Sequence, residues 1–123
     1  MTAQTDFRRL VPVLLGLAVV LQLVALYAPD APGSSSGIPY GDKVVHAVVF
    51  ALPVLVAGIG RRSWWPVVAV LGAVHAPMSE VIQHALLPQR SGDPWDVVAD
   101  LVGLGLASIG VVWVVRQRRR CPF

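Results

Sequence analysis

Four long runs of apolar residues, separated by short polar segments, dominate the pattern of this chain. They cover approximately residues 10–28, 43–60, 64–87 and 96–115. Each run is close to the roughly 20 helical residues that are needed to cross about 30 Å of hydrocarbon. The pattern therefore predicts an all-α, polytopic membrane protein, a four-transmembrane-helix bundle in which residues 1–123 form a single domain.

The third run is the least apolar of the four, because polar side chains lie in its second half. Arginine placement decides its assignment: arginines precede the first run, lie between the second and third, and follow the fourth. Basic flanks stay in the cytoplasm, so an even number of crossings must separate Arg62 from Arg116. The third and fourth runs therefore both cross, and we predict a multi-pass protein of the plasma membrane with cytoplasmic N and C termini.

The composition agrees with a membrane protein and explains the net charge. The chain is 55% hydrophobic and 14% charged, with a mean hydropathy of +0.67, and is far more apolar than a typical soluble domain. The predicted cytoplasmic side carries eight arginines against Asp6, whereas the outer half carries six acids against Lys43 and Arg90, which together give the formal charge of +3. The net positive charge thus comes from the arginines that set the predicted orientation in the membrane. We therefore expect no nucleic-acid partner.

Ionisable and amide side chains collect at the outer ends of three predicted helices and in the loop between the last two. The set comprises Asp42, Lys43, His46, Glu80, Gln83, Arg90, Asp93, Asp96 and Asp100. Within each helix, spacings of three or four residues put these groups on one face. An unpaired charge that faces lipid costs about 3 kcal/mol or more. We therefore expect the groups to face one another, or a wet cavity, as one binding cluster.

The basic members of this set are expected to neutralise the acids. Arg90 is the natural counter-ion, because its planar guanidinium can hold a carboxylate in two places. Lys43 can play the same part or extend toward the interface.

Small residues mark the face of the fourth helix that points into the bundle. Gly103, Ala107 and Gly110 follow Asp96 and Asp100 along roughly one stripe. Small residues allow helices to approach closely, so this stripe is predicted to pack against a neighbouring helix.

Two structural alternatives compete with a binding site. The cluster can be a buried salt-bridge network that joins the helices. A metal site can also be drawn from His46, Glu80, His84 and Asp100. A Glu-x-x-x-His spacing without a second histidine is no metal signature, so we predict neither a metal ion nor another cofactor. His75, on a different face from Glu80, is predicted to be a packed histidine bonded to the backbone.

Three segments carry a family resemblance: "DKVVHAVVF" from Asp42, "SEVIQ" from Ser79 and "RSGDPWDVVADLVGLGLA" from Arg90. In order and spacing they resemble the VanZ-like membrane proteins, whose pattern runs D-K-x-x-H-x-x-x-F, E-x-x-Q and R-x-x-D-x-x-D-x-x-x-N-x-x-G. The resemblance covers the second to fourth runs, about two-thirds of the chain. One position departs from it, because Asp100 stands where the family pattern has asparagine, which adds an acid to the cluster.

The resemblance implies a protein of the bacterial cell envelope. The family's namesake is associated with low-level resistance to teicoplanin, a glycopeptide antibiotic that acts at the outer face on lipid-linked cell-wall precursors. An outward-facing polar cluster fits a site for a membrane lipid headgroup or a lipid-linked or lipophilic molecule. We therefore favour a non-enzymatic function, in which this binding contributes to glycopeptide resistance.

Two other functions remain open. In a membrane hydrolase or transferase that acts on a lipid-linked envelope precursor, Glu80 or His46 would be the general base and Arg90 would hold an anionic group. No nucleophile adjoins either base, since Ser79 points about 100° away from Glu80 on a helix. A proton or ion transporter is the third hypothesis, because intramembrane acids often mark such paths, but here the acids stop in the outer half.

Overall fold

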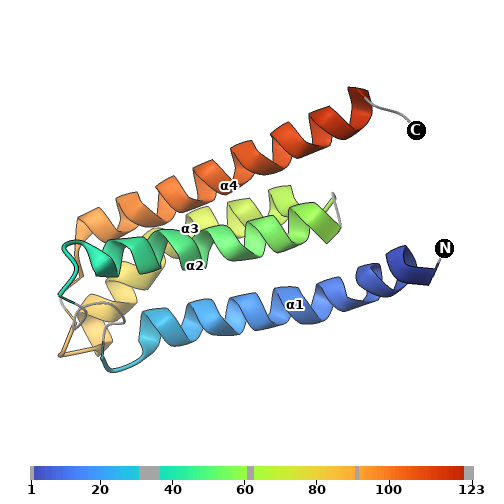
Figure 1. The fold of residues 1–123 in the computed structure, drawn as a ribbon. Coiled ribbons are helices and arrows are strands. Elements are labelled where there is room, and N and C mark those ends of the chain that lie inside the picture. The colour runs from blue at the N-terminus through green and yellow to red at the C-terminus, as the bar shows by residue number, and fades with distance from the viewer. Residues whose placement is uncertain (1, 31–36, 61–62, 91, 121–123) are drawn as a thin grey trace.

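The computed structural model describes residues 2–30, 37–60, 63–90 and 92–120. In these ranges the chain forms α1 (Thr2–Tyr27), α2 (Gly41–Gly60), α3 (Trp65–Leu86) and α4 (Pro94–Arg120), and no strand (Figure 1). Each helix is long and apolar enough to cross a membrane. The prediction of an all-α membrane protein built from four transmembrane helices is confirmed.

The first and last helices, α1 and α4, extend beyond the apolar runs that predict them. α1 begins at Thr2 rather than near residue 10, and α4 continues to Arg120 rather than ending near residue 115. Arginine is a good helix former, so a charged flank can continue the helix after the apolar run has ended. At 1.5 Å per residue, α4 is about 40 Å long and exceeds the roughly 30 Å of hydrocarbon.

The helices pack around α2. α4 lies along one side of α2 and α1 along the other, while α3 contacts both α2 and α4 and barely touches α1 (Figure 1). The buried core between them is apolar and includes Phe50, Val54, Leu104 and Val111. Large apolar side chains also cover the outside of the bundle, as a lipid-facing surface requires.

α2 and α4 are in close contact at a glycine. A Cβ atom added to Gly103 would overlap the backbone carbonyl of Ala47. Ala107, one turn further along α4, is also buried. The predicted small-residue contact is therefore present at these two positions, whereas a Cβ at Gly110 would meet nothing within 4 Å.

The bundle has two chemically different ends. The start of α1, the end of α2, the start of α3 and the end of α4 lie at one end (Figure 1). The other end holds the α1–α2 and α3–α4 connections and the first turns of α2 and α4. The predicted polar residues lie at this second end.

Candidate functional site

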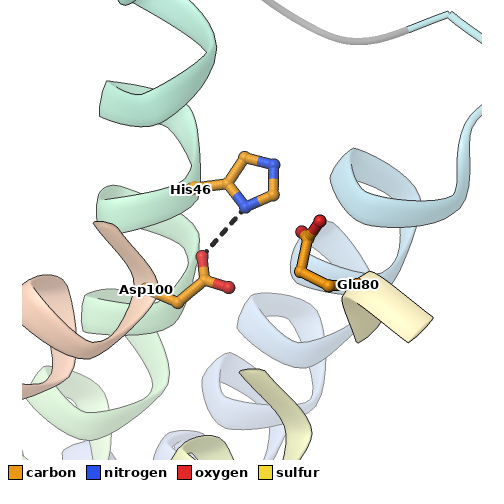
Figure 2. A group of neighbouring side chains, drawn as sticks. All are labelled: His46, Glu80 and Asp100. Atoms are coloured by element: carbon orange, nitrogen blue, oxygen red, sulfur yellow. Dashed lines mark hydrogen bonds and ion pairs between the residues drawn. The ribbon is translucent and has the colours of Figure 1, made fainter. Parts of the chain in front are cut away.

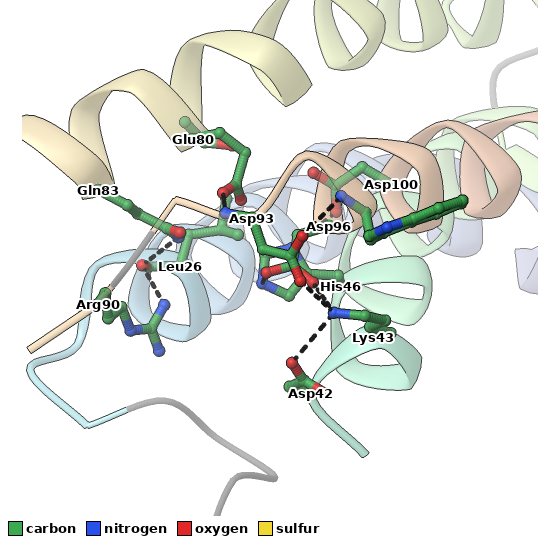
Figure 3. A network of polar contacts seen from close by, with 12 residues as sticks. Leu26, Asp42, Lys43, His46, Glu80, Gln83, Arg90, Asp93, Asp96 and Asp100 are labelled. Carbon is green, nitrogen blue, oxygen red and sulfur yellow. Dashed lines mark hydrogen bonds and ion pairs between the residues drawn. The ribbon is translucent and has the colours of Figure 1, made fainter. Parts of the chain in front are cut away.

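The structure brings the predicted polar residues together in two adjoining networks (Figure 3). One network, which we call the polar cluster, joins the acids to Lys43 and His46. Its members are Asp42, Lys43, His46, Glu80, Asp93, Asp96 and Asp100. The other network joins Gln83 and Arg90 to the end of α1.

Lys43 is the centre of the outer part of the polar cluster, which we call the rim. The rim comprises Asp42, Lys43, Asp93 and Asp96. Its Nζ lies 2.8 Å from Asp93 Oδ2, 2.9 Å from Asp96 Oδ1 and 3.5 Å from Asp42 Oδ2 (Figure 3). The Lys43 side chain is 24% exposed, and those of Asp42 and Asp93 are 39% and 37% exposed. One ammonium group from α2 therefore holds three carboxylates, one of them in the α3–α4 loop.

The loop carboxylate, Asp93, is stabilised in its charged form. The hydrogen bond from Lys43, supplemented by one from the backbone N–H of Trp95, lowers the pKa of Asp93 below its ordinary value. Asp93 is therefore ionised at neutral pH, and its ion pair ties the first turn of α2 to the start of α4.

The deeper part of the polar cluster, which we call the floor, consists of His46, Glu80 and Asp100 (Figure 2). Nδ1 of His46 and Oδ1 of Asp100 share a hydrogen bond of 2.9 Å. Oε2 of Glu80 accepts one from the backbone N–H of Asp93 over 2.9 Å. All three side chains are buried, and Asp100 is 0% exposed. α2, α3 and α4 thus each supply one ionisable group to the floor.

Two oxygen atoms at the floor lack a hydrogen-bond partner among the described residues. Oε1 of Glu80 and Oδ2 of Asp100 are buried, and neither has a hydrogen-bond partner within the described parts of the chain. The nearby rim group Asp96 instead places its Oδ2 3.8 Å from Nε2 of His46. A buried acceptor without a partner costs about 1 to 3 kcal/mol. The floor is therefore incompletely satisfied by the protein's own groups.

Within the described parts of the chain Arg90 forms no ion pair with a carboxylate, contrary to the expectation from the sequence. Its Nη1 donates to the backbone carbonyl of Leu26 over 2.5 Å, and its Nη2 donates to those of Ala25 and Asp30 over 3.1 and 3.3 Å. Gln83 Nε2 donates to the Leu26 carbonyl as well, over 2.8 Å. The last carbonyls of a helix have no partner within it, and Arg90 satisfies them at the end of α1. Lys43 takes the predicted place of Arg90 as counter-ion.

Burial affects the pKa of Arg90. Arg90 is only 8% exposed. That burial lowers the pKa of its guanidinium, although nearby acids oppose the effect. The group still stays charged at neutral pH, because a guanidinium is not deprotonated in proteins.

The two other histidines lie away from the floor. His75 is bonded to side chains of α1 rather than to backbone: Tyr27 Oη lies 3.0 Å from its Nε2 and Gln22 Nε2 lies 3.4 Å from its Nδ1. The expectation from the sequence did not include these partners, although Gln22, an amide inside an apolar run, signals a buried contact. His84 is exposed, so it does not join Glu80.

The serine beside Glu80 has a structural contact. Ser79 is fully buried and its Oγ donates to the carbonyl of Ala76 over 2.8 Å. A serine nucleophile must instead be aimed at the base that activates it. The geometry therefore gives no support to Ser79 as the nucleophile of a hydrolase.

Comparisons of this chain with protein-family models, with curated proteins and with solved structures found no match. The VanZ-like resemblance consequently rests on its motif residues. The structure brings most of the charged and histidine residues of those motifs into the polar cluster at one end of the bundle, whereas Arg90, in the α3–α4 connection, contacts the end of α1 (Figure 3).

Proposed function

We propose that this chain is a VanZ-like membrane protein of the bacterial cell envelope, whose polar cluster faces outward and binds the headgroup of an amphiphile. The supporting observation is the graded exposure of the polar cluster. Lys43, Asp42 and Asp93 at the rim are partly exposed, and they lead to a buried floor where two oxygens have no partner among the described residues. A polar path from interface to interior suits a molecule with its tail in lipid and its head against the protein.

The charge of the polar cluster favours a headgroup that carries a positive group. The polar cluster holds five carboxyl groups, three of them in contact with Lys43, and Arg90 does not offset them because it is bonded to the carbonyls of α1. Fixed negative charge at the membrane interface attracts cations and repels anionic headgroups. We therefore propose a primary amine as the group recognised, on a lipid such as phosphatidylethanolamine or on a lipophilic glycopeptide. Such binding would change the susceptibility of the cell to teicoplanin-type antibiotics.

Lipid binding tests this proposal. We expect the purified protein in detergent to bind phosphatidylethanolamine at least about fivefold more tightly than its N-acetylated form, because acetylation removes the positive charge. The double variant Asp42→Asn/Asp96→Asn should lose that preference, since it removes two rim charges. Titration followed by native mass spectrometry or calorimetry measures both quantities.

The matched control for the lipid experiment is Asp6→Asn, which removes an exposed acid at the opposite end of the bundle. This variant should bind the amine-bearing lipid as the unmodified protein does. Equal binding of the free and acetylated lipids by the unmodified protein would refute the recognition of an amine.

Cysteine labelling tests the proposed orientation. In a Cys121→Ser background, Gln89→Cys lies in the α3–α4 connection and Ser63→Cys precedes α3, and both positions are exposed. We expect a membrane-impermeant maleimide to label position 89 on intact cells and position 63 only after permeabilisation, because arginine flanks stay inside. The opposite pattern would place the polar cluster at the cytoplasmic face and overturn the proposal.

A further inference from the structure

The floor has the composition and spacing of a metal site. His46 on α2, Glu80 on α3 and Asp100 on α4 each offer one ligand atom, and these atoms all lie within 4.8 Å of one another (Figure 2). Ligands on opposite sides of a divalent ion are about 4 to 5 Å apart, twice a metal–ligand bond of roughly 2.0 to 2.5 Å. Only small side-chain movements are therefore needed to close the three groups on one ion.

The unpartnered oxygens point to a ligand independently of this spacing. Glu80 is 7% and Asp100 0% exposed, and each holds one buried oxygen that no group in the described ranges satisfies. Two neighbouring carboxylates in a dry site repel each other, and a hydrogen-bond donor or a cation between them removes that cost. A divalent cation does so for both oxygens at once.

We propose that His46, Glu80 and Asp100 bind a divalent transition-metal ion, with Zn²⁺ and Mn²⁺ as the candidates. One imidazole and two carboxylates form a mixed nitrogen and oxygen set, which suits these ions better than Mg²⁺ or Ca²⁺, whose ligands are oxygens alone. Three protein ligands also leave a coordination position open. That position would accept water or a polar group of a bound molecule.

The surroundings of the floor are suited to hold such ligands in place. Glu80 is oriented by the backbone N–H of Asp93, and Asp96 lies beside the second nitrogen of His46, 3.8 Å away. Groups that hydrogen-bond to ligands orient them and raise their affinity for the ion. Asp93 and Asp96 are in turn fixed by Lys43. Asp93 and Asp96 therefore have a positioning function for the floor, whereas Asp42 is paired only with Lys43 among the described residues.

The sequence offers four candidate metal ligands, His46, Glu80, His84 and Asp100, but it predicts no metal, because the Glu-x-x-x-His spacing lacks a second histidine. The structure brings three of the four together and leaves His84 exposed. The three come from three different helices, so their distances depend on the packing of α2, α3 and α4.

Metal loading of the purified protein tests the inference. The protein is prepared without a histidine tag, treated with a chelator, incubated with Zn²⁺ or Mn²⁺, desalted and analysed by elemental mass spectrometry. We expect about one ion per chain, and Glu80→Gln and Asp100→Asn should weaken the affinity at least about tenfold. The matched control is His84→Ala, which removes an exposed histidine of α3 and should leave both quantities unchanged.

A second measurement, on the unmodified protein, tests the proposal even where the variants fold poorly. Co²⁺ bound to the unmodified protein should give an absorption spectrum typical of nitrogen and oxygen ligands, and Zn²⁺ should raise the melting temperature of the unmodified protein and of His84→Ala. An unmodified protein that retains no more metal than Glu80→Gln, or that shows no Co²⁺ spectrum, would overturn the proposal in favour of a hydrogen-bonded floor without metal.

The metal and lipid experiments can fail separately. Asp42→Asn lies at the rim and outside the ligand set, so it should leave metal loading unchanged whatever it does to lipid binding. Lipid titrations of the chelated protein show whether headgroup recognition needs the ion. The inference therefore goes beyond the proposed function and does not depend on it.

Discussion

Gly103→Ala is expected to destabilise the folded bundle by about 3 kcal/mol, the upper part of the range for overpacking a well-packed core. The added methyl group would overlap the backbone carbonyl of Ala47. A backbone carbonyl cannot rotate away as a side chain can, so α2 and α4 would have to move apart. The same separation would lengthen the hydrogen bond between His46 and Asp100, which crosses this interface one turn away.

Gly105→Ala is the matched control for this substitution. Gly105 is exposed, and an added Cβ would meet nothing within 4 Å. Alanine there removes a flexible glycine from a helix and should be neutral or stabilising by up to about 1 kcal/mol. Thermal unfolding of both variants in the same detergent, followed by circular dichroism, measures the difference. Equal melting temperatures would show that α2 and α4 are not as close as the structure places them.

Arg90→Met is expected to destabilise the bundle by a similar amount, about 3 kcal/mol, because it leaves carbonyls at the end of α1 without a charged donor. The guanidinium donates to Ala25, Leu26 and Asp30. α1 has few contacts with α3, and these bonds join the end of α1 to the α3–α4 connection. The variant should therefore loosen the end of α1 in particular.

Two further substitutions sharpen the Arg90 experiment. Arg90→Lys keeps the charge but not the fork of donors, so its stability should lie between those of the unmodified protein and Arg90→Met. Arg116→Met removes an exposed arginine of α4 and should change stability by less than about 0.5 kcal/mol. Thermal unfolding and the distance between spin labels on α1 and α3 are the measurements. An Arg90→Met variant as stable as Arg116→Met, but with weaker ligand binding, would restore the reading of Arg90 as an anion-binding group.

The sequence was sufficient to predict the helices and the gathering of charges. Runs of about 20 apolar residues need no tertiary information to be identified as spans. The positions of Asp42, His46, Glu80, Asp96 and Asp100 within those spans set their depth and their faces. Because the cost of charge in lipid is large, that depth alone predicts their convergence.

The sequence was not sufficient to predict which groups are partners. Arg90 is expected from the sequence to pair with an acid, because the charges of side chains can be read from a sequence. The unpaired carbonyls at the end of α1, which Arg90 binds instead, are a property of backbone geometry. Likewise His75 was assigned to backbone, although Tyr27 and Gln22 are its partners. Both pairings depend on how α1 sits against the bundle, which no local pattern specifies.

The distribution of the floor over three helices has a consequence for biosynthesis. α1 carries no member of the polar cluster, so its apolar run can enter the bilayer by itself. His46 and Lys43 on α2 and Glu80 on α3 are synthesised before Asp96 and Asp100, which arrive only with the last helix. Until then the earlier helices expose ionisable groups that lipid solvates poorly. The polar cluster is therefore complete only after α4 has been synthesised. In a chain halted before α4, the ionisable groups of α2 and α3 would stay without their partners on α4.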